Sequence, residues 1–142
     1  MAIIIDGEVL YAAHLPDAHH HEVAKSALTT VTDGGYGDPT ISETIFDQAV
    51  ILAIKESGHP SIGEVLADKL RGVGPYDDRY RWLEVTPPVY TDSLAMLEET
   101  GGALSFTDAT TVALCEQHGI ESVLSFNSDF DPFLDRVAPA TV

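Results

Sequence analysis

The hydrophobic positions along the chain fall into two kinds of segment, short continuous apolar runs and longer stretches with helical spacing. Residues 2–5 and 122–126 are short runs of the kind that form strands buried on both faces. A further strand is predicted over residues 82–85, and the tail adds an edge strand around residues 136–138. Buried strands of this length are typical of a parallel sheet covered by helices.

Segments with apolar residues every three or four positions separate these runs and predict helices over residues 8–13, 18–31, 42–56, 61–70, 87–101 and 107–118. Residues 32–39 contain three glycines and predict a loop that matches no phosphate-binding pattern. The expected order is β-α-α-β-α-α-β-α-α-β, which includes a second strand between the helices at residues 18–31 and 42–56, and it has no repeats and no linker. It predicts an α/β fold, a three-layer α/β/α sandwich with a mainly parallel four- to five-stranded sheet, in a single domain over residues 1–142.

The helix predicted over residues 42–56 carries a polar anomaly. Its apolar stripe is formed by Ile41, Ile45, Ala49 and Leu52. Gln48 lies on or beside this stripe, whereas Asp47 is displaced toward its flank. A polar group near the core must be paired or it lowers stability. Two interpretations stay open: a satisfied or partly exposed amide, or a helix that directs Gln48 at a polar site.

Polar side chains follow two of the predicted buried strands. Asp6 ends the first, and Asn127, Asp129 and Asp131 follow the run at residues 122–126. Asp108 lies in the first turn of the helix predicted at residues 107–118. Thr107 is the expected N-cap, and Ser105 followed three residues later by Asp108 resembles a capping box. A helix N-terminus favours an ionised carboxylate. Because ligands of open α/β sheets bind outside the carboxyl ends of the strands, we expect an acidic cluster there.

Composition and length agree with one soluble domain. A chain of 142 residues with 44% hydrophobic residues is long enough for a substantial core. Its single cysteine, Cys115, excludes an internal disulfide and a zinc ribbon. No apolar run reaches the length of a membrane span and no signal peptide precedes Asp6, so we expect a cytoplasmic protein with no membrane association.

Charge is the unusual feature of the composition. Seven basic and 23 acidic residues give a net charge of −16. Such a surface repels nucleic acid at low salt, but in molar salt the Debye length falls to about 3 Å and the repulsion largely disappears. We interpret the acidity as a halophilic adaptation to a salty cytosol; the alternative is a basic partner.

Other motifs give weaker signals. The triplet at residues 19–21 offers three histidines, but neighbouring helical residues point in different directions, which favours a solvated helix start over a metal site. An aspartyl phosphohydrolase loop at residues 6–9 lacks its second aspartate and a downstream lysine motif. An EF-hand beginning at Asn127 fails because Pro132 and Ala138 occupy the glycine and glutamate positions.

Three segments resemble the PIN domain family, and in particular the VapC-like toxins of prokaryotic toxin–antitoxin pairs. They are IIIDGEVLYAA at residues 3–13, SETIFDQAV at 42–50 and LSFTDATTVALCEQHGIESVLSFNSDFD at 104–131. With the helical spacers between them, the resemblance covers essentially the whole chain. It implies a PIN-like sandwich, a Mg²⁺- or Mn²⁺-dependent ribonuclease that hydrolyses phosphodiester bonds of RNA, a homodimer and an antitoxin partner.

The resemblance also implies which residues form the site. The family's first and third acids fall on Asp6 and Asp108, while its helix acid falls on Gln48 and its fourth acid on Asn127. These four are the expected catalytic residues. Asp6 and Asp108 are the expected metal ligands, with Asp129 as a further candidate. The threonine usual after the first acid is replaced by Gly7.

The two amides affect the expected activity, because Mg²⁺ prefers charged oxygen ligands. Gln48 and Asn127 keep the shape and one acceptor oxygen but supply no charge, so metal binding is expected to weaken. Two functions stay open: a PIN-type endoribonuclease that is weakened or inactive in this copy, and a non-catalytic PIN-fold module that binds an antitoxin or RNA.

We expect folding to depend on salt, because a net charge of −16 repels itself unless it is screened. The midpoint of thermal unfolding should rise from dilute buffer to molar KCl. A flat or falling midpoint contradicts the halophilic interpretation.

Overall fold

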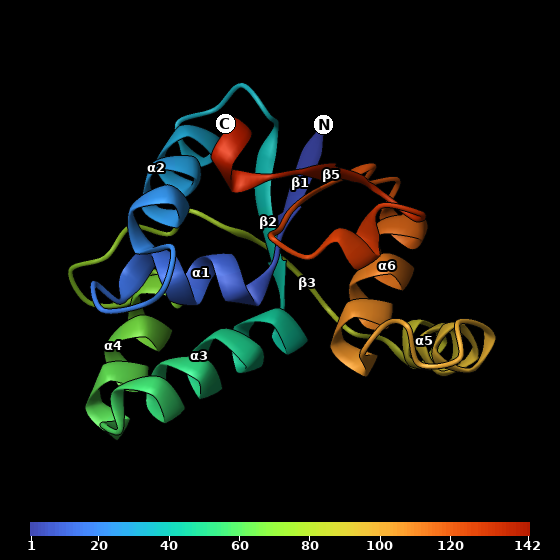
Figure 1. The fold of residues 1–142 in the computed structure, drawn as a ribbon, viewed down its shortest axis with the longest axis horizontal. Helices are drawn as coiled ribbons and strands as arrows, with labels where there is room; N and C mark the ends of the chain where they lie inside the picture. Colours follow the sequence, from blue (N-terminus) through green and yellow to red (C-terminus); the bar gives the residue numbers. More distant parts are fainter.

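A computed structural model, which describes all of residues 1–142, contains a five-stranded sheet between two layers of helices (Figure 1). All pairs of neighbouring strands are parallel, and the strand order is β3-β2-β1-β4-β5. The strands are β1 Ala2–Ile5, β2 Asp38–Ser42, β3 Arg81–Leu83, β4 Ser122–Leu124 and β5 Asp135–Val137. The predicted three-layer α/β/α sandwich is therefore confirmed.

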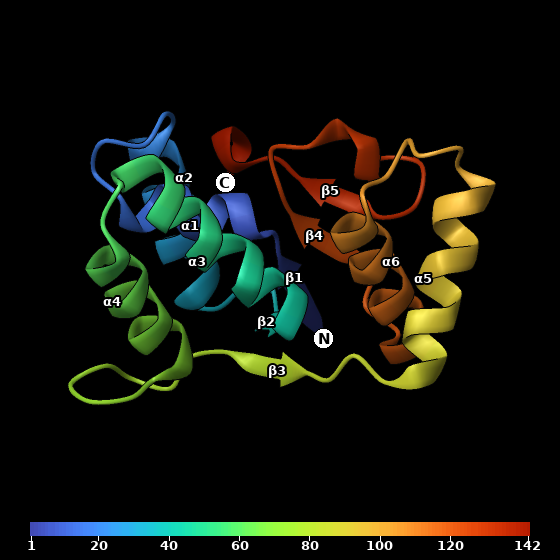
Figure 2. The same cartoon turned by 90° about the horizontal axis from the view of Figure 1, so that it is seen from below.

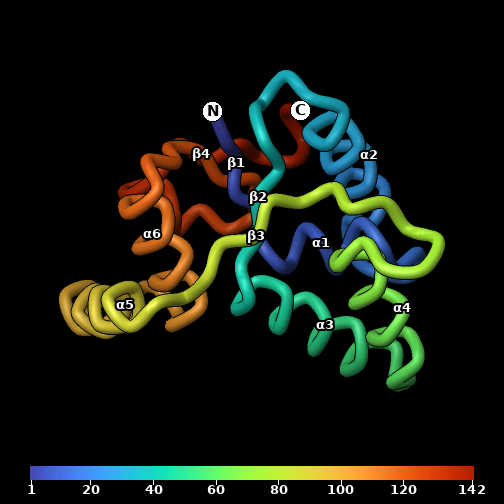
Figure 3. Tube along the Cα trace, turned by 180° about the vertical axis from the view of Figure 1, so that it is seen from behind, coloured from blue at the N-terminus to red at the C-terminus, as the bar shows by residue number.

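The helices divide between the two faces of the sheet. They are α1 Gly7–His14, α2 His21–Thr32, α3 Glu43–Ser57, α4 Pro60–Arg71, α5 Pro87–Glu99 and α6 Phe106–His118, with short 3₁₀ turns η1 Ser128–Phe130 and η2 Pro139–Thr141. Figure 2 shows α1 to α4 on one side and α5 and α6 on the other. The strand order explains this division, because right-handed crossovers place helices on opposite faces when the chain reverses direction across the sheet. The segment containing β3 runs from α4 across to α5 (Figure 3).

Strand β2 corrects the prediction of a loop over residues 32–39. Its first two residues, Asp38 and Pro39, pair with Ala2 and Ile3 of β1, whereas pairing with β3 begins only at Thr40. Pro39 therefore lies at a position where β2 has one neighbour, which tolerates a missing N–H. This strand is short and largely polar, so no apolar run indicated it. Ile41, which the spacing places on a helical stripe, is a buried residue of β2.

Two helix starts also differ from the prediction. Ser105, and not Thr107, is the N-cap of α6, and its hydroxyl accepts a hydrogen bond from the backbone N–H of Asp108 at 3.1 Å. Helix α2 begins at His21, so most of the histidine triplet precedes the helix. His20 adopts a left-handed backbone conformation with φ of 65° and stacks on Phe126 at a ring separation of 5.2 Å. No helix is long and apolar enough to cross a membrane.

Helix α6 contains the longest continuous run of buried residues of any helix. Its residues from Asp108 to Cys115 are all buried, because α6 contacts both α5 and α3 in addition to its place against the sheet. The strands beside it are equally enclosed, and Ile3, Ile4 and Ile5 have no exposed surface. The polar first turn of α6 is thereby held at a fixed position beside the ends of β1 and β4.

A close approach between α1 and α3 accounts for the glycine at position 7. A Cβ atom at Gly7 would lie 2.5 Å from Gln48 Oε1 and 3.0 Å from the carbonyl oxygen of Ile45. The space that a side chain at position 7 would need is occupied by the amide of Gln48. Glycine at position 7 and glutamine at position 48 are therefore coupled by packing.

We expect Gly7→Ala to destabilise the protein by about 1–3 kcal/mol, because crowding outweighs the better helix propensity of alanine. In a Gln48→Ala background the same change should cost less, since the amide is gone, although the Ile45 carbonyl remains close. Urea unfolding of the two single variants and the double variant measures this coupling. Strictly additive effects contradict it.

Candidate active site

The strand order places a topological switch point between β1 and β4. The connection from β1 leads to one side of the sheet and the connection from β4 leads to the other. Ligand sites of open parallel sheets lie at such a point, outside the carboxyl ends of the strands. Asp6 follows β1 directly, and Ser125 and Asn127 follow β4.

Asp6 is fixed by both its backbone and its side chain. Its N–H donates to the carbonyl of Leu124 at 3.0 Å, which continues the β1–β4 pairing. The carboxylate makes no capping bond to α1, and its Oδ2 accepts a hydrogen bond from the Ser125 hydroxyl at 2.7 Å. With only 4% of its surface exposed, Asp6 is a buried carboxylate at the end of a central strand.

Asp108 is joined to Asp6 and Ser125 through Asn127. The side-chain Nδ2 of Asn127 donates to Asp108 Oδ2 at 3.2 Å, and the backbone N–H of Asn127 donates to the Ser125 hydroxyl at 2.9 Å. Ser125 and Asn127 thus link Asp6 to Asp108 in one continuous network. Asp108 is 8% exposed and lies in the first turn of α6.

Ser125 is a member of this network that the sequence did not reveal. It lies within the run at residues 122–126, whose apolar character predicts a buried strand throughout. The structure ends β4 at Leu124 and leaves Ser125 fully buried just beyond it. The sequence signal that could have identified Ser125 was a hydroxyl side chain one residue before the expected end of the strand.

The Asn127 amide uses both of its polar atoms. Its Oδ1 accepts a hydrogen bond from the backbone N–H of Asp129 at 3.0 Å, which caps the η1 turn. That bond directs the Nδ2 donor toward Asp108. Asn127 therefore holds Asp108 as a hydrogen-bond donor, a role that an ionised aspartate at this position would not fill.

The remaining candidates lie around this network. Gln48 packs against Gly7, next to Asp6 in sequence, and its Oε1 is buried without a hydrogen-bond partner. Asp129 is exposed, and Asp47 is exposed on α3. Asp131 forms an ion pair with Arg136 at 2.7 Å and is not part of the network that joins Asp6 to Asp108.

Burial raises the pKa of both buried carboxyl groups. The pKa of Asp6 rises to about 6, mainly through burial, while the Ser125 hydrogen bond lowers it and the charges of Asp108 and Glu8 raise it further. Burial also raises the pKa of Asp108, where the hydrogen bond from Ser105 acts in the opposite direction and the charge of Asp129 adds to the rise. A cation between these groups would relieve the cost of ionising them.

The polar side chains gathered here carry oxygen donors of the kind that bind a hard divalent cation, with few negative charges. Asp6 and Asp108 supply carboxylate oxygens, and Gln48 supplies a buried amide oxygen without a donor. These are the ligand atoms that Mg²⁺ and Mn²⁺ prefer. No cluster of three or more acidic, histidine or cysteine side chains is arranged to hold a metal, so the charge available is small.

A cleft opens beside the network, with a volume of about 920 Å³. Gln48 and Glu8 lie on its wall together with Phe126, and the rest is formed by α1, α3, the start of α4 and the segment that precedes α2. Its apolar lining residues are Tyr11, Ala12, Leu15, Ala18, Leu52, Ile62 and Phe126. Gln48 therefore lies both on the wall of an open cleft and against Gly7.

We expect Asp6 to make the metal-free protein less stable as pH rises. Its pKa is about 6 in the folded chain against an ordinary value of 3.8, so the folded state binds the proton more tightly. This stabilisation is complete below about pH 4 and is lost as pH rises through about 6. Because the two pKa values differ by about two units, the free energy of unfolding should fall by about 3 kcal/mol over this range. Urea unfolding with a chelator present, from pH 4 to 7.5, should show the loss relative to Asp6→Asn. A pH-independent difference between the two proteins contradicts the expectation.

Comparison with known proteins shows the family. A model of the PIN domain matches residues 3–133. A search among proteins of curated function finds no match. The match begins in β1 and ends after η1, so it includes Asp6, Gln48, Asp108 and Asn127.

Solved structures share the fold at low sequence identity. VapC20 from Mycobacterium tuberculosis, described as a Sarcin-Ricin loop cleaving toxin, has a TM-score of 0.76 and 19% identity, over 92% of this chain and 93% of its own. VapBC2 from Rickettsia felis, bound to a DNA fragment from its promoter, has a TM-score of 0.68 and 12% identity, over 96% and 98%. A toxin–antitoxin complex from Klebsiella pneumoniae has a TM-score of 0.65 and 16% identity, over 99% of each chain. Since the family model matches the chain over nearly its whole length, the protein belongs to the PIN domain family.

Proposed function

We propose that the protein is a divalent-metal-dependent endoribonuclease of the VapC toxin type, weakened by the amides at positions 48 and 127. The observation that carries the proposal is the network that joins Asp6 to Asp108 through Ser125 and Asn127 at the switch point of the sheet. The similarity to a Sarcin-Ricin loop cleaving toxin supports RNA as the substrate.

Asp6 and Asp108 would hold Mg²⁺ or Mn²⁺, with Gln48 Oε1 as a neutral ligand and Asp129 as an outer acid. The bound metal would polarise the phosphodiester and lower the pKa of the attacking water. Ser125 positions the Asp6 carboxylate by hydrogen bonding, and Asn127 positions Asp108. With its pKa near 6, the Asp6 carboxyl in the metal-free protein exchanges its proton close to neutral pH.

The structure supplies a physical reason for weakened activity. Asn127 donates a hydrogen bond to Asp108 Oδ2, so it occupies a lone pair that would otherwise be open to a cation, and it adds no negative charge. Gln48 presents an oxygen but also adds no charge. Only two carboxylates then attract the metal ion, whereas the family pattern has four acids.

A non-catalytic binding module is the second candidate, and one observation favours it. Asn127 satisfies both Asp108 and the N–H of Asp129, so this part of the site is complete without a metal. The cleft beside it has an apolar floor and three carboxyl groups, those of Glu8, Asp17 and Glu56. A basic, amphipathic segment of an antitoxin fits such a lining, and the toxin–antitoxin complexes among the similar structures support such a partner. We also propose that the protein is a homodimer, which rests on the resemblance alone. The proposed salty cytosol rests on the net charge alone.

Restoring both acids should recover metal binding and cleavage, and neither single change should do so fully, because the two carboxylates act on one ion and their effects are coupled. The measurement is Mn²⁺ calorimetry with RNA cleavage in high KCl on the chain as it stands, Gln48→Glu, Asn127→Asp and the double variant. Without metal, Asn127→Asp should also lower the melting temperature, since it places a like charge against Asp108, and Mn²⁺ should reverse the loss.

Gln117→Glu provides the matched control, because it makes the same change of charge at an exposed position of α6. It should alter neither metal affinity nor cleavage, while Asp6→Asn should abolish the activity of the double variant. Failure of the double variant to bind metal contradicts the nuclease proposal and leaves the binding module. Strong, Asp6-dependent cleavage by the chain as it stands contradicts the proposed weakening.

A further inference from the structure

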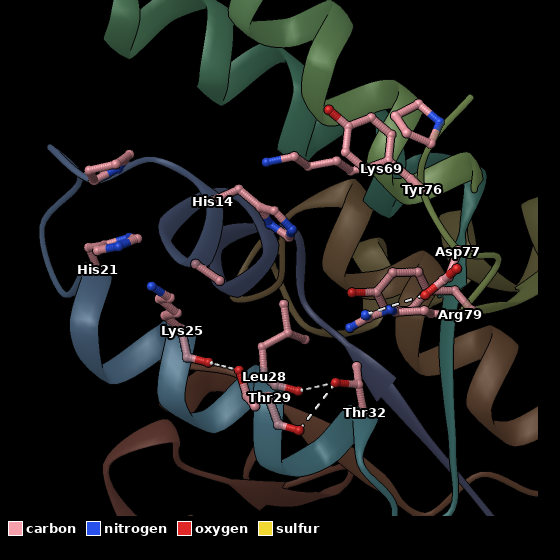
Figure 4. Close-up of a pocket in the computed structure, with 14 residues that line it drawn as sticks. His14, His21, Lys25, Leu28, Thr29, Thr32, Lys69, Tyr76, Asp77 and Arg79 are labelled. Atoms are coloured by element: carbon pink, nitrogen blue, oxygen red, sulfur yellow. Dashed lines mark hydrogen bonds and ion pairs between the residues drawn. The ribbon is translucent and has the colours of Figure 1, made fainter. Parts of the chain in front are cut away.

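A second pocket, of about 470 Å³, lies near the C-terminal end of α1 and gathers much of the scarce positive charge of the chain (Figure 4). Only seven residues of the whole sequence are lysine or arginine, and three of them, Lys25, Lys69 and Arg79, line this pocket. His14 and His21 line it as well, and Asp77 is its single acidic residue. In a protein with a net charge of −16, this concentration of cations is exceptional.

These cations come from different parts of the fold and surround one space. Figure 4 shows Lys25 and His21 on α2 at one side, Lys69 and Arg79 at the opposite side, and His14 between them. Neither lysine forms an ion pair; Lys69 contacts the ring of Tyr76, with Nζ 5.7 Å from its centre. The pair of Arg79 with Asp77, at 3.7 Å, is exposed and therefore weak.

Each of the two histidines uses one ring nitrogen, Nδ1, to contact a backbone carbonyl of α1. His14 Nδ1 lies 2.7 Å from the carbonyl oxygen of Leu10, and His21 Nδ1 lies 2.7 Å from that of Ala12. A bond to a carbonyl requires the proton on Nδ1, which leaves Nε2 free to bind or to gain a proton. His21 Nε2 is 3.9 Å from Glu22, an exposed residue.

The basic groups of the pocket are close enough to act on one another. The pKa of His14 is lowered, first by burial and then by the charges of Lys69, His21 and Arg79, against the opposing effect of the Leu10 carbonyl. Mutual repulsion of this kind is relieved by an anion placed between the groups. The pocket wall itself supplies little negative charge, because Asp77 is its single acidic residue and is exposed.

We propose that this pocket binds a phosphate-bearing ligand of about nucleotide size. A site that collects two lysines and an arginine, with two histidines as further hydrogen-bonding groups, matches a multiply charged anion better than a single carboxylate. Its volume lies in the range of small-ligand sites, and Leu28, Tyr76 and Pro75 provide surface for a ring. The hydroxyls of Thr29 and Thr32 already donate to backbone carbonyls, so charge defines the specificity.

The phosphate group has two sources with the same chemistry, a free nucleotide and the 5′ end of an RNA. The inference does not rest on the nuclease proposal, because the pocket shares no residue with the network of Asp6, Asp108, Ser125 and Asn127.

The test is calorimetric titration of the full chain with pyrophosphate, with ADP, and with a short RNA that does or does not carry a 5′ phosphate. A chelator removes divalent metals, so that the acidic network plays no part. Lys69→Met and Arg79→Met should each weaken binding by roughly tenfold or more, the loss of one charge-assisted hydrogen bond. Lys55→Met, at an exposed position of α3 outside the pocket, is the matched control and should leave the affinity unchanged. Ligand should also shift the imidazole NMR signals of His14 and His21.

Binding of ADP assigns the site to a free nucleotide, and binding of only the 5′-phosphorylated RNA assigns it to an RNA end; either result supports the proposal. Binding of none of the four probes overturns it. Equal weakening by Lys55→Met and Lys69→Met, or binding that leaves both histidine signals unmoved, overturns it as well.

Discussion

Burial of two like-charged carboxyl groups at the meeting point of β1 and β4 is the constraint on which the candidate site depends. Asp6 and Asp108 are each less than a tenth exposed, and ionising both in that position is unfavourable without compensation. Hydrogen-bond donors from Ser125 and Asn127 supply part of this compensation. The rest of the fold provides the enclosure: central strands without exposed surface, and a helix α6 buried along most of its length.

Much of this arrangement could be predicted from the sequence, because it follows from strong local patterns. The apolar runs of β1 and β4 identified central strands, and helix periodicity gave the layers. A carboxylate at the end of β1 together with one in the first turn of α6 indicated the switch-point edge. A strand end and a helix first turn are thus sufficient to predict that Asp6 and Asp108 lie together at this edge of the sheet.

What the sequence missed depends on tertiary context. Strand β2 has almost no apolar signal and exists because β1 and β3 pair with it on either side. The bridging role of Ser125 depends on where β4 ends, a boundary that periodicity does not fix. Nor does spacing show that the Gln48 amide fills the space above Gly7, since this requires the separation of α1 and α3.

Helix α1 has only eight residues, so it is about 12 Å long, and it is a single rigid element with different chemistry at its two ends. Its N-terminus adjoins the buried carboxylates, and the carbonyls of Leu10 and Ala12 near its C-terminus hold the two histidines of the cationic pocket. A displacement of α1 along its axis therefore changes both environments at once. The length of α1 thus sets the distance between a cluster of buried carboxyl groups and the cationic pocket.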